Sequence, residues 1–286
     1  HVDPEMIKAS SSVSHKNHKS YNMLKQPSIK TKLVNVQGDL VSPVSITASM
    51  PFSTVDYLKQ LRENVDETKN NICADCGTTD AVEWISLNFL TIFCLKCSGI
   101  HRSLGSNISR IRSLKLDHFK GEQEILIKYA NNARANLYLE YHASKGNKKI
   151  TPSATDEQRL EFIRSKYLKL QYCEKNEQDV LDNKLIASVQ TINVPDTVKY
   201  TSLQADINMQ LTMNLGGDTV KMSLIEYSLR KYVEFEKEDK KFFVLTEVLV
   251  LNGAKVEGIN KLRDEIGLVA EAKQYWSDRI NKLQGA

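Results

Sequence analysis

The sequence is poor in cysteine, in long apolar runs and in net charge, and each shortage excludes a class of protein. Five cysteines in 286 residues argue against a disulfide framework. No run approaches the roughly 18 apolar residues of a membrane span, and no signal-peptide pattern appears, so we expect a soluble, intracellular protein. The net charge of +4 is too small to indicate nucleic acid by itself.

Length and composition set the expected number of domains. A chain of 286 residues with 41% apolar content can bury a sizeable core, and we expect about two domains. Residues 1–50 are expected to be a disordered linker, because the serine-, lysine- and histidine-rich stretch from Ser10 to Ser20 has no apolar periodicity. Within it, His1 to Met6 are interpreted as an expression-vector scar.

Four of the five cysteines form two Cys-x-x-Cys pairs. Cys73 and Cys76 are separated from Cys94 and Cys97 by 17 residues, a spacing typical of a closed tetrahedral zinc site. In a reducing compartment such paired thiols favour metal over disulfides. We therefore predict one structural zinc ion per chain, bound by these four residues. Cys173 is expected to be a small buried hydrophobe.

The residues around the cysteines resemble the catalytic domain of the Arf GTPase-activating proteins, the ArfGAP family. That family's pattern is Cys-x2-Cys-x16-Cys-x2-Cys-x4-Arg, and Arg102 follows the last cysteine at the x4 spacing. The long gap is one residue longer here, and the extra residue is assigned to the stretch before Trp84. The segment from Phe162 to Tyr167 resembles the family's Phe-Ile-x-x-Lys-Tyr element. The resemblance covers residues 53–172 and implies an α+β fold, a small sheet surrounded by helices.

The local patterns of this domain predict short elements around the cysteines and longer helices after them. Ser53 and Thr54 are candidate N-caps of a first helix. The further predicted elements are two short strands within 84–93, a short helix over 98–104 that stops at Gly105, a strand within 108–117, one long helix from Gly121 to Tyr141, and a helix carrying Phe162 to Tyr167.

Residues 180–286 are predicted to be all-α and to contain two to three divergent ankyrin repeats. The segments 203–208 and 249–256 both resemble the end of an ankyrin repeat, where a helix runs out through Gly-Ala-Asp-Val-Asn. Their alanines, Ala205 and Ala254, lie 49 residues apart, whereas the usual period is about 33. A charged insertion at 231–241 accounts for the excess. A branch of the ArfGAP family carries ankyrin repeats directly after its catalytic domain; a generic helical bundle is the alternative.

The resemblance also implies a function, acceleration of GTP hydrolysis on an Arf-class small GTPase in its GTP form. Arg102 is then the catalytic arginine, supplied in trans, and the chain has no independent active site. Trp84 and Ile85 are expected to shape the surface that faces the GTPase. Asp117 resembles a family aspartate at the end of a strand and is expected to orient the side of the domain that carries the arginine. His101 is assigned no chemistry, since four cysteines complete the zinc.

Such a protein is expected to act in vesicle trafficking, in the cytoplasm and peripherally at Golgi or endosomal membranes. The positive net charge is compatible with contact to an anionic membrane surface. Three alternatives remain: a non-catalytic scaffold of zinc module and repeats, a GATA-type DNA-binding finger, and a self-sufficient enzyme. The finger is disfavoured because an apolar helix follows the basic residues instead of a basic tail. The enzyme is disfavoured because four thiolates leave zinc no open coordination position.

Overall fold

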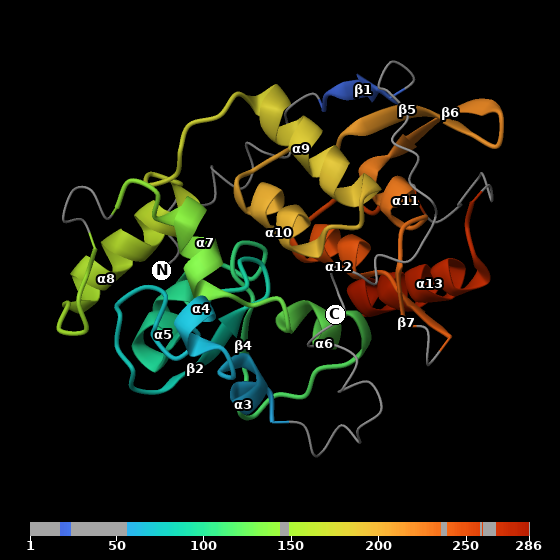
Figure 1. Cartoon of the computed structure of the whole chain (residues 1–286). Helices are drawn as coiled ribbons and strands as arrows, with labels where there is room; N and C mark the ends of the chain where they lie inside the picture. The colour runs from blue at the N-terminus through green and yellow to red at the C-terminus, as the bar shows by residue number, and fades with distance from the viewer. Residues whose placement is uncertain are drawn as a thin grey trace. The chain divides into compact units, whose positions relative to one another are not determined.

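The computed structural model describes residues 18–23, 56–143, 149–235, 239–257, 259 and 267–285. These residues form two compact units, each described by itself below (Figure 1). Unit 1 contains the described residues from 56 to 177, and unit 2 combines residues 18–23 with those from 178 onward. Among the described helices, none is long and apolar enough to cross a membrane.

Unit 1 is a small antiparallel sheet surrounded by short helices, which confirms the predicted α+β class for this part of the chain. The sheet has the order β3-β2-β4. Its strands are β2 (Val82–Ser86), β3 (Ile92–Cys94) and β4 (Ile111–Ser113). The helices are α3 (Tyr57–Leu61), α4 (Val65–Thr68), α5 (Leu95–Ser103), α6 (Gly121–Ile127), α7 (Asn132–Leu139), α8 (Asp156–Ile163) and the π-helical turn η3 (Arg164–Leu168).

The central strand β2 shows why these residues form a sheet. Ile85 pairs with Ile92 of β3 on one side and with Arg112 of β4 on the other. Ile85 and Phe93 are both fully buried, so the strand pairing and the apolar core stabilise each other. The predicted pair of strands within 84–93 is confirmed.

Two helix predictions for unit 1 need correction. The N-cap of α3 is Asp56, whose carboxylate accepts the Lys59 backbone N–H at 3.0 Å; Ser53 and Thr54 lie outside the described residues. The single helix expected from Gly121 to Tyr141 is two helices, α6 and α7. Asn131 caps α7, and its neighbour Asn132 is buried, where its side-chain oxygen accepts the Ile92 N–H at 2.7 Å. An apolar period continues through this break, but α6 ends at Ile127, and the side chains of the two asparagines bond backbone groups where α7 begins.

Unit 2 is not all-α, and that prediction was wrong. It contains the strands β1 (Ser20–Asn22), β5 (Gln210–Leu215), β6 (Asp218–Ser223), β7 (Val233–Phe235) and β8 (Lys240–Phe242). Its helices are α9 (Gln178–Gln190), α10 (Val194–Ser202), α11 (Leu224–Ser228), α12 (Val244–Leu251) and α13 (Ala270–Gln284). The chain turns between β5 and β6 at Gly216 and Gly217, which both have positive φ, as hairpin turns require.

The core of unit 2 lies along α12, whose residues are all buried. Figure 1 shows α9 beside α10, and α10 also packs against α12. The charged insertion expected at 231–241 coincides with the β7–β8 hairpin.

Part of the segment expected to be a disordered linker is a strand. β1 pairs parallel to β5, with Ser20 opposite Gln210 and Asn22 opposite Thr212. Of residues 1–50, the structure describes 18–23, and the others lie outside the described residues. A strand of three residues is too short to show an alternation of apolar and polar residues, so its own sequence could not predict it.

Candidate metal centre and the surface around it

The four paired cysteines come from two turns that different elements hold in place. The first turn follows α4: Cys73 N–H bonds the Thr78 carbonyl at 2.8 Å, and Gly77 closes it with a φ of +79°. The second turn lies where β3 passes into α5, with Cys94 as the N-cap of that helix. Sheet and helix thus fix the directions of both pairs of thiols.

The geometry of these thiols fits zinc. The sulfur atoms of Cys73, Cys76, Cys94 and Cys97 all lie within 4.8 Å of one another, and all four residues are buried. The Cys76 and Cys94 sulfurs are 3.7 Å apart. A tetrahedron with Zn–S bonds of about 2.3 Å has edges of about 3.8 Å. None of the four is in a disulfide, so the set is a closed four-thiolate zinc site, as predicted.

Donors around the sulfurs complete the site. The Cys94 N–H points at the Cys73 sulfur at 3.3 Å, and the Cys97 N–H points at the Cys94 sulfur at 3.5 Å. Arg159 of α8 donates from Nη1 to the Cys97 sulfur at 3.2 Å and is itself almost fully buried. Such donors offset the negative charge of four thiolates and orient the ligands.

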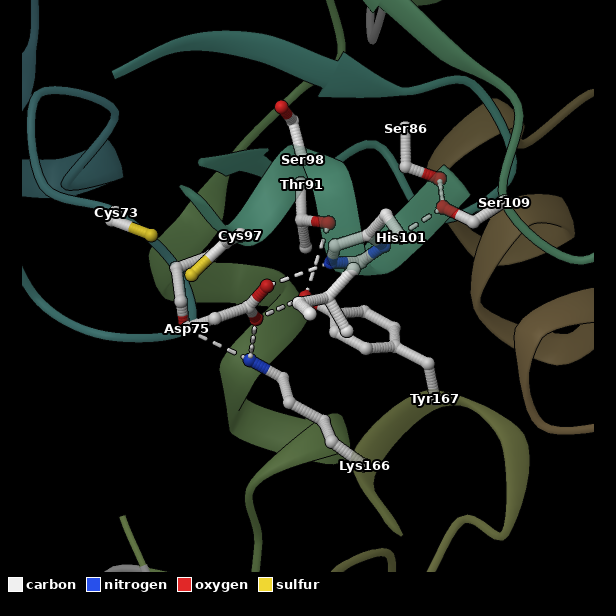
Figure 2. A network of polar contacts seen from close by, with 12 residues as sticks. Cys73, Asp75, Ser86, Thr91, Cys97, Ser98, His101, Ser109, Lys166 and Tyr167 are labelled. Carbon is white, nitrogen blue, oxygen red and sulfur yellow. Dashed lines mark hydrogen bonds and ion pairs between the residues drawn. The ribbon is translucent and has the colours of Figure 1, made fainter. Parts of the chain in front are cut away.

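A buried polar network adjoins the zinc site, and its centre is Asp75, inside the first cysteine pair (Figure 2). Lys166 of η3 bonds Asp75 Oδ1 at 2.9 Å and Glu140 Oε2 at 2.7 Å. The Tyr167 hydroxyl donates to Asp75 Oδ1 at 2.6 Å, and His101 Nε2 lies 2.7 Å from Asp75 Oδ2. The network links the first zinc turn to α5 and η3.

The charges of this network hold one another in place. Burial acts to raise the pKa of Asp75, but the ammonium of Lys166 and the contact with His101 outweigh it and hold that pKa below its usual value. Burial acts to lower the pKa of Lys166, but Asp75 and Glu140 raise it. Burial and the adjacent carboxylate raise the pKa of Tyr167, so its hydroxyl remains a donor.

Arg102 lies on the exposed side of α5. The helix is fixed by Cys94 and Cys97 at its start, and the chain leaves it through Gly105 at a φ of +99°. The guanidinium carbon of Arg102 lies 5.1 Å from the ring centre of Trp84, a cation–π contact with the half-buried indole on β2. Its backbone is therefore anchored while its charged end remains at the surface.

Comparison with known proteins places this arrangement in a family. Residues 58–176 match the family model ArfGap, described as "Putative GTPase activating protein for Arf". This part of the chain belongs to the ArfGAP family.

Curated relatives agree with that placement. "ADP-ribosylation factor GTPase-activating protein effector protein 1" of Saccharomyces cerevisiae is 30% identical over 80% of this chain and 48% of its own length. "Protein csx2" of Schizosaccharomyces pombe is 32% identical over 71% of this chain and 20% of its own length. "ADP-ribosylation factor GTPase-activating protein AGD12" of Arabidopsis thaliana is 42% identical over 38% of this chain and 32% of its own length. The chain thus spans about half the length, or less, of these relatives.

One surface residue expected in the ArfGAP domain is wrongly assigned. Ile85 was expected to shape the surface that faces the GTPase, but its side chain is fully buried, on the strand β2 at the middle of the sheet. Side chains alternate along a strand, so of the neighbours Trp84 and Ile85 only one reaches the surface. Ile85 is a core residue of the ArfGAP domain.

Asp117 lies next to a different arginine from the predicted catalytic one. Its Oδ2 accepts from Arg112 Nε at 3.1 Å and from the Ser113 N–H at 2.7 Å. Arg112 also donates to Gln123 and to the His118 carbonyl, and it lies over the ring of Phe119. Asp117 therefore closes the turn after β4 and fixes Arg112.

Several residues of the ArfGAP domain went unnoticed in the sequence, namely Asp75, Arg159 and Lys166 as members of the zinc surroundings. His101, to which no chemistry was assigned, is fully buried, stacks on Phe93 with ring centres 4.0 Å apart, and its Nε2 lies 2.7 Å from Asp75 Oδ2. One signal was available, because Asp75 lies between two zinc ligands. Lys166 was noted only as the lysine of the Phe-Ile-x-x-Lys-Tyr element, and its distance of 91 residues from Asp75 gave no sign that the two side chains meet.

Proposed function

We propose that this chain accelerates GTP hydrolysis by an Arf-class small GTPase, with Arg102 supplied in trans. The observation that carries the proposal is the difference between two arginines of the ArfGAP domain. Arg112 is tied to Asp117, Gln123 and a backbone carbonyl, whereas Arg102 is exposed on a helix anchored by the zinc site.

Arginine suits this role for a physical reason. Charge builds up on the phosphoryl oxygens during transfer, and an inserted guanidinium stabilises that charge with a planar pair of donors, an effect of about 10³–10⁵-fold in such systems. Trp84 contributes by holding the guanidinium at the surface before the GTPase arrives. The closed zinc site then acts as a rigid base and takes no part in the chemistry.

Single-turnover GTP hydrolysis by a panel of small GTPases, with and without this protein, tests the proposal. We expect acceleration with an Arf-class member in the panel. Arg102→Lys keeps the charge and loses the planar fork, so it should lose about 10²-fold or more of the acceleration, with zinc content and thermal stability unchanged. Arg110→Lys, at another exposed arginine of the domain, is the matched control and should retain activity. A flat panel would instead favour a non-catalytic scaffold.

We also propose that unit 2 consists of divergent ankyrin-type repeats. The ends of α10 and α12 are built alike: Ala205 N–H bonds the Tyr200 carbonyl at 3.0 Å, and Ala254 N–H bonds the Leu249 carbonyl at 3.1 Å. The preceding residues, Gln204 and Gly253, both have positive φ. Two helix pairs, α9/α10 and α11/α12, that meet through α10 and α12 support stacked repeats. An experimental structure whose helix pairs do not superpose on ankyrin repeats would contradict this.

The expected place of action, at Golgi or endosomal membranes in vesicle trafficking, belongs to the same proposal. It rests on the family and on the net charge of +4. Binding to anionic vesicles and to neutral vesicles, compared at increasing salt, tests the membrane contact. We expect weak binding to anionic vesicles that salt abolishes.

A further inference from the structure

In unit 2, one edge of β5 pairs with β6, and the other edge pairs with β1, a strand from a distant part of the sequence. β1 pairs parallel to β5, and Lys19 O accepts the Gln210 N–H at 3.1 Å (Figure 1). Residues 18–22 lie far before those they contact in the sequence: 188 positions separate His18 from Asp206, and 161 separate Tyr21 from Asp182. An edge strand is a ready template for such an addition.

Lys19 and Tyr21 of this segment meet aspartates of α9. Lys19 forms an ion pair with Asp179, and the Tyr21 hydroxyl donates to Asp182 Oδ2 at 2.5 Å. Residues two apart on a strand share a face, and residues three apart on a helix also share one. Lys19 and Tyr21 therefore project from one face of the segment toward Asp179 and Asp182, which lie on one face of α9.

The contact with Asp182 is buried. The Asp182 side chain is fully inaccessible, and its other oxygen accepts from Gln178 Nε2 at 2.8 Å and from the Asp206 N–H at 2.7 Å. Burial, followed by the bond to Asp182, raises the pKa of Tyr21, so its hydroxyl remains a donor. Without Tyr21 the Oδ2 of a buried carboxylate would lose this donor.

A third contact fixes the start of the segment. His18 Nδ1 lies 3.0 Å from Asp206 Oδ1, and the Lys19 N–H bonds Asp206 Oδ2 at 3.3 Å. On the other side of the ring, His18 Nε2 lies 3.1 Å from Lys255 Nζ. A neutral imidazole with its proton on Nδ1 satisfies both neighbours.

We propose that unit 2 contains a strand-addition site specific for a His-Lys-x-Tyr segment, and that residues 18–22 of the same chain are its resident occupant. In strand addition the main-chain bonds supply affinity and the side-chain pockets supply specificity. Here the edge of β5 supplies the main-chain bonds. The side-chain contacts that give specificity come from Asp179, Asp182 and Asp206. Ser20, at the variable position, is exposed.

The occupant precedes unit 1 in the chain and the site follows it. Among the described residues, unit 1 therefore lies in the sequence between two pieces of unit 2, residues 18–23 and the residues from 178 onward. The inference does not depend on the proposed activity of unit 1.

Hydrogen exchange of the full chain, followed by mass spectrometry over β5, tests the site. Tyr21→Ala should speed exchange of the segment 210–215 by about tenfold, the loss expected for a hydrogen bond to a buried charged group. Ser20→Ala is the matched control in the same strand and should leave exchange unchanged. Equal exchange in wild type and Tyr21→Ala would overturn the proposal.

A charge exchange tests the recognition itself. Lys19→Asp should speed exchange over β5 by about two- to fivefold, the scale of an exposed ion pair. Adding Asp179→Lys should restore it, because the pair is re-formed with the signs reversed. Failure of this rescue would count against a specific site. Protection that disappears on dilution, together with a dimer mass, would show that a second copy supplies the strand and would overturn the assignment within one chain.

Discussion

The two units of this chain solve the problem of a small core in different ways. Unit 1 places charged groups at its centre: Asp75 and Lys166 are fully buried beside four thiolates and Arg159. Unit 2 is centred on α12, which is buried along its whole length and is apolar except for Thr246 and Glu247. A core of paired charges and a metal holds only while every partner is present, whereas an apolar core loses stability in proportion to what is removed.

The largest expected effect is loss of the metal. Cys76→Ser, or prolonged chelation, should unfold unit 1, because structural zinc contributes an apparent binding free energy of about 10–16 kcal/mol to folding. Elemental analysis should find one zinc per chain in the wild type and none in stoichiometric amount in the variant. Unit 2 should keep its hydrogen-exchange protection. Cys173→Ala, outside the cluster, is the control, and a zinc-free protein with unit 1 intact would contradict the comparison.

Removal of the buried ammonium should come next. Lys166→Met removes the cation that Asp75 and Glu140 share; Glu140 keeps its ion pair with Lys149, but Asp75 loses its buried lysine, which costs about 3–5 kcal/mol for a broken buried pair. Urea denaturation monitored in unit 1 should show this loss. Lys169→Met, at an exposed lysine of the same turn, should change little. Equal stability of the two variants would mean that the network contributes nothing to the fold.

The counterpart in unit 2 is a truncation in α12. Leu249 is fully buried, and Leu249→Ala should destabilise unit 2 by about 2–5 kcal/mol through lost burial and a cavity. Zinc content and the exchange protection of unit 1 should not change. If unit 1 lost zinc as well, the two units would not be the separate cores described here.

A smaller effect concerns pH and lies in α6 of unit 1. Burial lowers the pKa of Lys128 to about 8, against a partly compensating attraction from Glu124. Between that value and the unfolded pKa of about 10.4, the unfolded chain binds the extra proton, so stability should rise with pH by up to about 2 kcal/mol. Lys128→Met should remove this rise between pH 8 and 10. A rise of the same size in the variant would assign it to another group.

The smallest effect compares the two helix ends of unit 2. Gln204, after α10, has a φ of +68°, and the corresponding residue after α12 is Gly253, with a φ of +84°. Gln204→Gly should stabilise unit 2 by about 1 kcal/mol, because a side chain is strained in the left-handed region. Gln204→Ala keeps a Cβ and should give no such gain. Equal thermal midpoints for these two variants would argue against the strain.

The sequence revealed what is local and missed what is distant. The two Cys-x-x-Cys pairs and the glycine after α5 act within a few residues, so local spacing predicted them; the role of Arg102 came from the family resemblance and stays a prediction. Asp75 finds His101 26 residues away and Lys166 91 residues away, and no period connects such positions. The strand β1 was missed for the same reason, because its three residues form a strand only by pairing with β5, which is distant in the sequence.

Two errors had nearer causes. The Gly216–Gly217 pair flanked by alternating residues is a hairpin signal, but the repeat pattern of the neighbouring helices led to an all-α prediction. Ile85 was grouped with Trp84 because the two are adjacent, although adjacent strand residues face opposite sides of a sheet. Both errors arose from giving family likeness more weight than local geometry.

The insertion of unit 1 between β1 and the rest of unit 2 also sets an order of events during synthesis. His18 leaves the ribosome 188 residues before its partner Asp206, a delay of about 10 to 40 s at 5–20 residues per second. All four zinc ligands emerge within that interval, so the zinc site can close before β5 is available to pair with β1. The pairing of β1 with β5 can therefore form only after all four zinc ligands of unit 1 have emerged.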